Sequence, residues 1–412
     1  MTPKGSFENQ YEDYSAEVAS NIINESRDGI SEKFQTKLQK FKTEKLQYLK
    51  VEMARDIFHD GTVYTGSAGL ALFYLMYSVR NDFNHEMLQA ALDYIDIDKL
   101  KGRKISFLCG DAGPLAIAAV ISYKLGAKHI EHKLPDYNTL ALRLMSLISL
   151  INESPDELLY GKSGYLYALL FVNKHISVKE IIPANHIIKV IDSILMAGKC
   201  YSIATKSKSP LLWNWHDKVY FGAAHGMAGI LYMLLQARSY INIKEIRNYI
   251  KPTLDWLMNQ RFQSGNFPSS LGSTSGDKLV QWCHGAPGFV ALCILAHHVK
   301  IRIVFDEEKY MKIAQQCGDV VWQRGLSTKG YSICHGVSGN AYAFLQLYQA
   351  TMKPEYLHRA CCFMEWCAVA RLGTELHHPD RPASLFEGLI GRLYLAEEMS
   401  HVLEAKFPAF TL

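Results

Sequence analysis

The chain has 412 residues, of which 49% are hydrophobic and 20% are charged, and its net charge is +4. That charge is small and is not gathered into a long basic block, so nucleic acid is not an expected partner. The N-terminus lacks the apolar core of a signal peptide, and no uninterrupted apolar run reaches the roughly 18 residues of a membrane helix, so we expect a cytoplasmic protein without a membrane anchor. Nine cysteines, an odd number in such a chain, indicate reduced thiols rather than a disulfide framework.

The first 60 residues contain a charged stretch from Lys33 to Lys50 and none of the repeats that follow. We expect this segment, residues 1–60, to form one or two helices as an N-terminal extension packed on the main body. Residues 61–412 are expected to form a single barrel domain.

A Gly-x-x-Gly pair recurs along the rest of the chain at intervals of 44 to 65 residues. Such a period is typical of one supersecondary unit repeated, in which each unit buries its apolar face against its neighbours. The seven pairs are Gly66/Gly69, Gly110/Gly113, Gly161/Gly164, Gly226/Gly229, Gly285/Gly288, Gly336/Gly339 and Gly388/Gly391.

An apolar run follows each glycine pair, and an amphipathic stretch separates one run from the next. Leu70–Met76 and Tyr165–Val172 are apolar nearly all round, as buried helices are, whereas Glu86–Tyr94 has apolar residues only at helical spacing. The alternation predicts an all-α fold, a double α/α toroid of seven inner and seven outer helices. The longest polar insertions are the loops where substrates are expected to bind, namely Thr205–Asp217, Asn266–Asp277 and Gly373–Pro382.

The residues just ahead of the first glycine of each pair carry the chemistry. Equivalent positions of a toroid converge near its axis, so side chains far apart in sequence become neighbours. In three of the repeats these positions place cysteine and histidine side chains together: His225, Cys283, His284, Cys334 and His335.

Two thiolates and one imidazole from this group would make a Zn²⁺ site of catalytic type, with a fourth position open. The spacing does not say whether His284 or His335 is the nitrogen ligand, and His225 could be a ligand or a general acid/base. The competing interpretation, cysteine as a small core residue, is weakened by two Cys-His-Gly motifs one repeat apart. We expect the other seven cysteines to be core residues.

These motifs resemble those of the eukaryotic lanthionine synthetase C-like (LanC-like) proteins, relatives of the bacterial lantibiotic cyclases. The similarity extends nearly end to end and is closest to the glutathione-binding members. It is carried by the segments Tyr11–Tyr14, Phe107–Ala116, Leu159–Tyr165, Gly222–Gly229, Trp282–Gly288, Ile333–Tyr342, Ser384–Gly388 and Phe407–Phe410.

The resemblance implies one Zn²⁺ per chain, held by Cys283, Cys334 and His335, and the double seven-helix barrel. It also implies that His225 is the catalytic acid/base. The implied activity is addition of the thiol of glutathione, the co-substrate, to dehydroalanine or dehydrobutyrine in peptides or proteins, or to other electrophiles. These dehydroamino acids form when phosphoserine or phosphothreonine loses phosphate.

Glutathione contacts are also implied by the resemblance. One is Lys329, five residues before the second zinc cysteine. A second group belongs to a loop whose first residue is arginine in relatives and histidine in this chain, and a third contact is a basic residue near the N-terminus. The loop residues are His377, His378, Pro379 and Asp380, and the basic residue is Lys4.

Several charged positions stay outside this assignment. An arginine that precedes the first zinc cysteine in the bacterial cyclases has only Lys278 as its counterpart here. An acidic residue of the family could correspond to Asp111, Asp156 or Glu157.

Two other kinds of function remain alternatives. A sensor or scaffold could bind zinc and glutathione, without turnover, and dock a signalling protein. By fold analogy alone, α/α toroids also include glycosidases and prenyltransferases. A glycosidase needs paired carboxylates, and the residues ahead of the glycines offer only Glu387.

Overall fold

The computed structural model describes residues 5–53, 60–81, 84–177, 180–299, 307–369 and 379–412. Within these ranges every regular element is a helix, and strand pairing is limited to four isolated bridges. No helix of the described residues has the length and apolar character needed to cross a membrane. The predicted all-α character is therefore present throughout.

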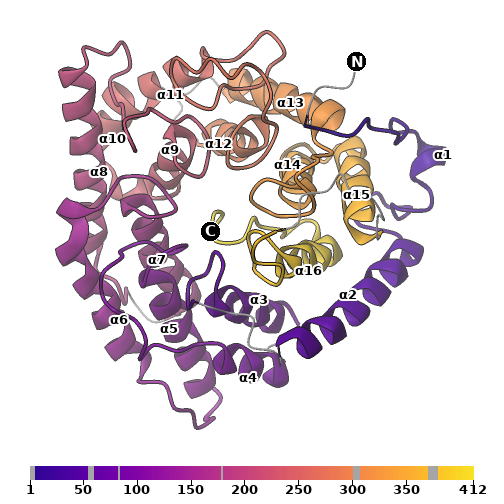
Figure 1. Ribbon diagram of the computed structural model, residues 1–412, viewed down its shortest axis with the longest axis horizontal. Coiled ribbons are helices and arrows are strands. Elements are labelled where there is room, and N and C mark those ends of the chain that lie inside the picture. Colours follow the sequence, from indigo (N-terminus) through magenta and orange to yellow (C-terminus); the bar gives the residue numbers. More distant parts are fainter. Residues whose placement is uncertain (1–4, 54–59, 82–83, 178–179, 300–306, 370–378) are drawn as a thin grey trace. The chain divides into compact units, whose positions relative to one another are not determined.

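The chain divides into two compact units, whose helices are labelled in Figure 1. The α3–α11 unit comprises Phe58–Tyr220, Ala224–Asn259 and Leu412. The α12–α16 unit comprises Met1–Ile57, Phe221–Ala223 and Gln260–Thr411, and so includes α1 and α2 as well.

Each glycine pair opens a buried helix, as the repeat predicts. Six of the seven helices have the first glycine of the pair as their N-cap, and the backbone of that glycine is extended in five of the six. In the α3–α11 unit these helices are α3 (Ser67–Arg80), α5 (Ala112–Gly126), α7 (Lys162–His175) and α9 (Met227–Gln236). In the α12–α16 unit they are α12 (Ala286–His298), α14 (Val337–Thr351) and α16 (Leu389–Glu398).

The amphipathic stretches form a second set of helices beside the first. Helices α4, α6 and α8 pack on α3, α5 and α7, while α13 and α15 pack on α12 and α14. The set consists of α4 (His85–Asp93), α6 (Tyr137–Ser146), α8 (Ala184–Ala204), α10 (Ile243–Glu245), α11 (Lys251–Met258), α13 (Glu307–Arg324) and α15 (Pro354–Ala368). Four short segments follow or join these helices: η1 (Leu147–Glu153) follows α6, η2 (Arg238–Tyr240) follows α9, η3 (Ile246–Ile250) joins α10 to α11, and η4 (Met399–His401) follows α16.

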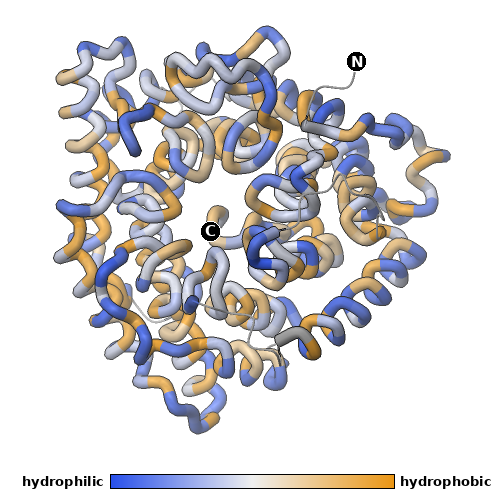
Figure 2. Tube along the Cα trace, in the orientation of Figure 1, coloured by the Kyte–Doolittle hydropathy of each residue, from blue (hydrophilic) through white to orange (hydrophobic). Residues whose placement is uncertain are grey.

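The N-terminal residues form α1 (Ala16–Ala19) and α2 (Glu32–Met53). Helix α2 packs on α16, in the position that an amphipathic helix holds beside every other buried helix of its unit. Figure 2 shows hydrophilic and hydrophobic positions alternating along α2, as expected of a helix with one buried face. On that face the buried Lys42 Nζ pairs with Glu397 Oε2 of α16 at 2.8 Å.

The second glycine of the pair is needed for close packing. At five of these positions a Cβ would collide with the carbonyl oxygen of the residue six places earlier, as at Gly339 against Ile333. The loop therefore folds directly over the first turn of its own helix, which only a residue without a Cβ allows. The five are Gly113, Gly164, Gly288, Gly339 and Gly391.

Backbone hydrogen bonds join the loops ahead of successive glycine pairs. Within each unit an N–H from one repeat reaches a carbonyl at the same place in the next repeat, so the predicted convergence holds there. The bonds are Tyr64 N to Leu108 O (3.0 Å), Cys109 N to Leu159 O (3.1 Å), Leu158 N to Ala224 O (3.3 Å), Cys283 N to Cys334 O (3.1 Å) and Cys334 N to Phe386 O (3.0 Å).

Candidate active site

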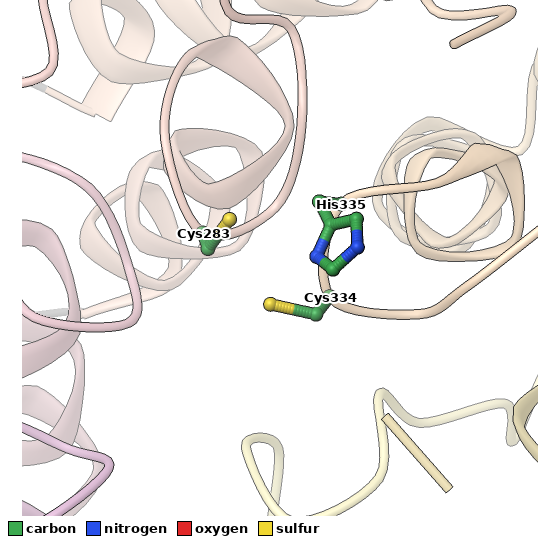
Figure 3. A group of neighbouring side chains, drawn as sticks. All are labelled: Cys283, Cys334 and His335. Carbon is green, nitrogen blue, oxygen red and sulfur yellow. The ribbon is translucent and has the colours of Figure 1, made fainter. Parts of the chain in front are cut away.

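The loops ahead of α12 and α14 bring two thiols and one imidazole together. The Sγ atoms of Cys283 and Cys334 and a ring nitrogen of His335 lie within 4.8 Å of one another. Figure 3 shows both thiols directed into the same space, with the imidazole of His335 beside them. Both cysteines are buried, and His335 is half-buried.

The two Cys-His-Gly segments have different backbones, although their sequences match. Gly285 has φ of 107°, in the left-handed region, whereas Gly336 has φ of −109°. His284 closes a tight turn in which its N–H bonds Gln281 O and its carbonyl accepts from Gln281 N, both at 3.1 Å. Among the described residues, the metal-binding atoms that gather are therefore those of Cys283, Cys334 and His335, without His284.

The surroundings of Cys283 favour its thiolate. A hydrogen bond with Cys334 holds the pKa of Cys283 below its ordinary value against the opposing effect of burial, assisted by the charge of Lys329 and the amide of Gln281. Gln281 Nε2 donates to Cys283 Sγ at 3.1 Å. By contrast, burial raises the pKa of Cys317 to about 12, as befits a core thiol.

This donor set fits a zinc ion. Zinc–sulfur bonds of about 2.3 Å and zinc–nitrogen bonds of about 2.0 Å place tetrahedral ligand atoms roughly 3.5 to 4 Å apart, which small rotations of these side chains would reach. Three protein ligands would leave the fourth position for a thiol or water.

The prediction for the remaining cysteines holds for six of the seven. Cys200 is exposed, so its assignment to the core is wrong. It lies on α8, where Met196 and Ile203 are also exposed. Because this helix has apolar residues on its exposed face as well, the sequence pattern does not distinguish its exposed face from its buried one.

The predicted glutathione contacts are only partly within the described residues. Lys329 belongs to the loop ahead of α14, and its charge acts on Cys283. Pro379 is half-buried and Asp380 is exposed. Lys4, His377 and His378 lie outside the described residues.

His225 stands in the loop ahead of α9, in the α3–α11 unit. Its Nδ1 lies 2.8 Å from Oε2 of Glu157, whose side chain is 1% exposed. The same carboxylate accepts the N–H groups of Leu159 at 2.9 Å and Tyr160 at 2.6 Å. Because an ionised carboxylate only accepts hydrogen bonds, this contact places a proton on Nδ1 and leaves Nε2 for other partners.

An aromatic ring covers one face of this imidazole. The indole of Trp215 stacks on His225 with ring centroids 4.0 Å apart and planes inclined by 11°. Trp215 belongs to the loop Thr205–Asp217, which was expected to bind substrate. The loop turns sharply after it, with left-handed φ values of 46° at His216 and 58° at Asp217.

Of the three acidic candidates, Glu157 is the partner of His225. Asp156 instead pairs with Lys162 Nζ at 2.8 Å, and burial raises the pKa of the Asp156 carboxyl despite that lysine. Asp111 accepts the N–H of Arg103 at 3.0 Å. Lys278 is exposed.

A sequence signal for Glu157 exists four residues before the first glycine. In five repeats a side-chain oxygen at this position accepts the N–H of the residue just ahead of the glycine; the acceptors are Thr62, Ser106, Glu157, Ser332 and Ser384. Glu157 is the only carboxylate among these five, and its second oxygen reaches His225. Gln281 holds the same position in the first Cys-His-Gly repeat and contacts Cys283 instead.

Comparison with known proteins agrees with this picture. Residues 57–412 match the lanthionine synthetase C-like protein family. Glutathione S-transferase LANCL1 of Danio rerio is 39% identical over 416 residues, covering all of both chains. LanC-like protein GCL1 of Arabidopsis thaliana is 33% identical over 371 residues, covering 86% of this chain and 82% of its own.

A solved structure confirms the fold class. Nisin cyclase superposes with a TM-score of 0.58 at 17% sequence identity, covering 90% of this chain and 98% of its own. At that identity the likeness concerns the fold alone. The predicted α/α toroid class is thus confirmed.

Proposed function

Since the chain belongs to the lanthionine synthetase C-like family, we propose that it is a zinc-dependent glutathione transferase that forms thioethers. The acceptors would be dehydroalanine or dehydrobutyrine in peptides and proteins, or other electrophiles. The observation that carries the proposal is the convergence of Cys283, Cys334 and His335. The name of the 39% identical relative supports glutathione as the thiol substrate.

The ligand residues give the metal a defined role. Zn²⁺ held by Cys283, Cys334 and His335 would act as a Lewis acid that keeps a thiol at its open position in the thiolate form. Gln281 donates a hydrogen bond to Cys283 and so fixes the direction of that ligand. The positive charge of Lys329 favours an anionic substrate near these residues.

The reaction also needs a proton donor. When a thiolate sulfur bonds to the β-carbon of a dehydroamino acid, the electrons of the carbon–carbon double bond move to the α-carbon as an enolate. His225 would take up on Nε2 the proton that the thiol releases and would then deliver it to that carbon, returning to the neutral tautomer in which Nδ1–H bonds Glu157. Trp215 covers one face of the ring, and since Nε2 donates in the plane of the imidazole, the substrate would meet it at the ring edge.

We propose that glutathione is bound by Lys329, whose charge acts on Cys283, and by the segment that includes Pro379 and Asp380, together with His377, His378 and Lys4. A histidine at 377 offers a weaker, pH-dependent contact for a carboxylate than an arginine would.

A direct assay tests the proposed function. The purified protein is incubated with glutathione and a dehydroalanine peptide, and the peptide mass is followed. The proposal predicts a peptide carrying one glutathione at a rate far above that without protein. A protein that binds zinc and glutathione stoichiometrically yet gives no added mass would favour the sensor alternative and overturn the proposal.

A further inference from the structure

The N-terminal residues pair with the loop that precedes the second cysteine. Phe7 N donates to Leu326 O at 2.7 Å, and Thr328 N donates to Gly5 O at 3.1 Å. These bonds flank an antiparallel bridge between Ser6 and Ser327. All of these residues belong to the α12–α16 unit.

Side chains hold the same segment against α13 and α15. Asn9 Nδ2 donates to the carbonyl of Trp322 at 2.8 Å, and Trp322 Nε1 donates to Asp13 Oδ1 at 2.8 Å. The ring of Phe7 lies 5.9 Å from that of Trp366. Residues 5–13, which we call the N-terminal strap, are therefore held at several points.

The strap residue Ser6 pairs with Ser327, and Ser327 contacts a residue of the candidate active site. Ser327 is 5% exposed, and its Oγ donates to the carbonyl of the metal-binding residue His335 at 3.2 Å. The same oxygen accepts the backbone N–H of Lys329 at 3.1 Å. Ser327 thus lies between the two backbone bonds to the strap, and its hydroxyl bonds a predicted zinc ligand and a predicted glutathione contact.

These bonds fix the main chain of the loop between α13 and α14 at several points. Pairing with Gly5 and Phe7 fixes the main chain on either side of Ser327, and the hydroxyl then fixes the main chain of His335 and Lys329. Small displacements of a metal ligand weaken a site strongly, because residues that orient the ligands typically contribute 10- to 100-fold in metal affinity or activity.

We infer that the N-terminal strap is a working part of the active site, and that Ser327 is the positioning residue through which it holds His335 and Lys329. The inference rests on the proposed function only in taking zinc and glutathione as the groups that this site binds. A terminal segment about 320 residues away in sequence would then affect metal retention and glutathione affinity.

The first test compares Ser327→Ala with Ser327→Thr in the full-length protein. Zinc affinity is measured by competition with a chromophoric chelator, and glutathione affinity by calorimetry. Ser327→Ala is expected to weaken zinc binding by about 10-fold or more and to weaken glutathione binding, while Ser327→Thr retains the hydroxyl and restores both. Ser20→Ala, which removes a serine hydroxyl bonded to the Glu17 carbonyl in the same unit, is the matched control.

The second test reaches the strap itself and does not depend on substitution of Ser327. Phe7→Ala keeps the N–H that bonds Leu326, whereas Phe7→Pro removes it. The difference between the two variants isolates the backbone pairing, and Phe7→Pro should reproduce the losses of Ser327→Ala.

Neither binding measurement requires turnover, so the strap and the proposed reaction can fail separately. Unchanged zinc and glutathione affinities in Ser327→Ala and Phe7→Pro, with only a lower melting temperature, would overturn the inference. Normal affinities in the wild type without thioether product would overturn the proposed function instead.

Discussion

Glu157 and His225 stand 68 residues apart in the chain, yet their side chains meet at 2.8 Å through Oε2 and Nδ1. The carboxylate is held in place by two backbone N–H groups, so it orients the imidazole rather than the reverse. This arrangement, a buried acid that fixes the working nitrogen of a histidine, is the one expected of a proton-transfer residue.

We predict that Glu157→Gln lowers kcat for thioether formation by roughly 100-fold, in the range that a positioned acid or base contributes. An amide in place of the carboxylate offers Nδ1 a mixture of donor and acceptor and no longer fixes the tautomer. The assay is glutathione addition followed by mass spectrometry.

Asp111→Asn is the control for this prediction, because Asp111 is an acid of the same unit that bonds Arg103 N instead of His225. It should retain nearly full kcat. A Glu157→Gln protein with wild-type kcat and wild-type zinc content would show that the pair does not serve the reaction.

The glycine repeat leads to a stability prediction. Gly339→Ala places a Cβ against the carbonyl of Ile333, so either the loop or the helix must shift, and overpacking of this kind costs about 1 to 3 kcal/mol. We expect a lower urea midpoint at unchanged slope.

Gly126→Ala provides the comparison. It lies at the end of α5, where a Cβ meets nothing within 4 Å, so the change should be neutral or should stabilise the helix by up to about 1 kcal/mol. Equal losses in the two variants would contradict the close-packing explanation of the repeat.

The contact between α2 and α16 is tested through its buried ion pair. Lys42→Met leaves Glu397 buried without that partner, and the loss of one member of such a pair costs about 3 to 5 kcal/mol. The double variant Lys42→Met with Glu397→Leu should recover most of that loss, because hydrophobic replacement of both partners is often neutral. Chemical unfolding of the three variants measures the coupling, and additive losses would argue against it.

The buried helices could be predicted from the sequence because the glycine repeat is required by close packing of each loop on the helix that follows it. Each pair marks the start of a buried helix, where loop and helix backbones touch. The place of α2 was less visible. It lies ahead of the first glycine pair, so its role beside α16 depends on tertiary contacts that no local pattern contains.

The site was predictable as a set of residue types but not in its details. Aligned positions brought Cys283 and Cys334 together, whereas the choice of His335 over His284 required the family resemblance. The structure supplies a physical reason, since the left-handed backbone at Gly285 and the turn from Gln281 to His284 distinguish two segments of equal sequence.

Glu157 stands out from the other acidic candidates only when one position is compared across the repeats. The position four residues before the glycine is filled by serine or threonine in four of the seven repeats, and the departures are Glu157, Gly222 and Gln281. The side chains of Glu157 and Gln281 each contact a residue of the predicted chemistry. The stacking of Trp215 on His225 depends on a loop conformation and had no such signal.

The most direct test of the account is the metal content and thioether yield of Cys334→Ala, measured on the same preparation. Cys200→Ala is the control, because Cys200 is an exposed thiol on α8. We predict that Cys334→Ala folds but loses bound zinc together with thioether product, while Cys200→Ala keeps both. A zinc-free Cys334→Ala protein that still adds glutathione to a dehydroalanine peptide at the wild-type rate would contradict the central claim.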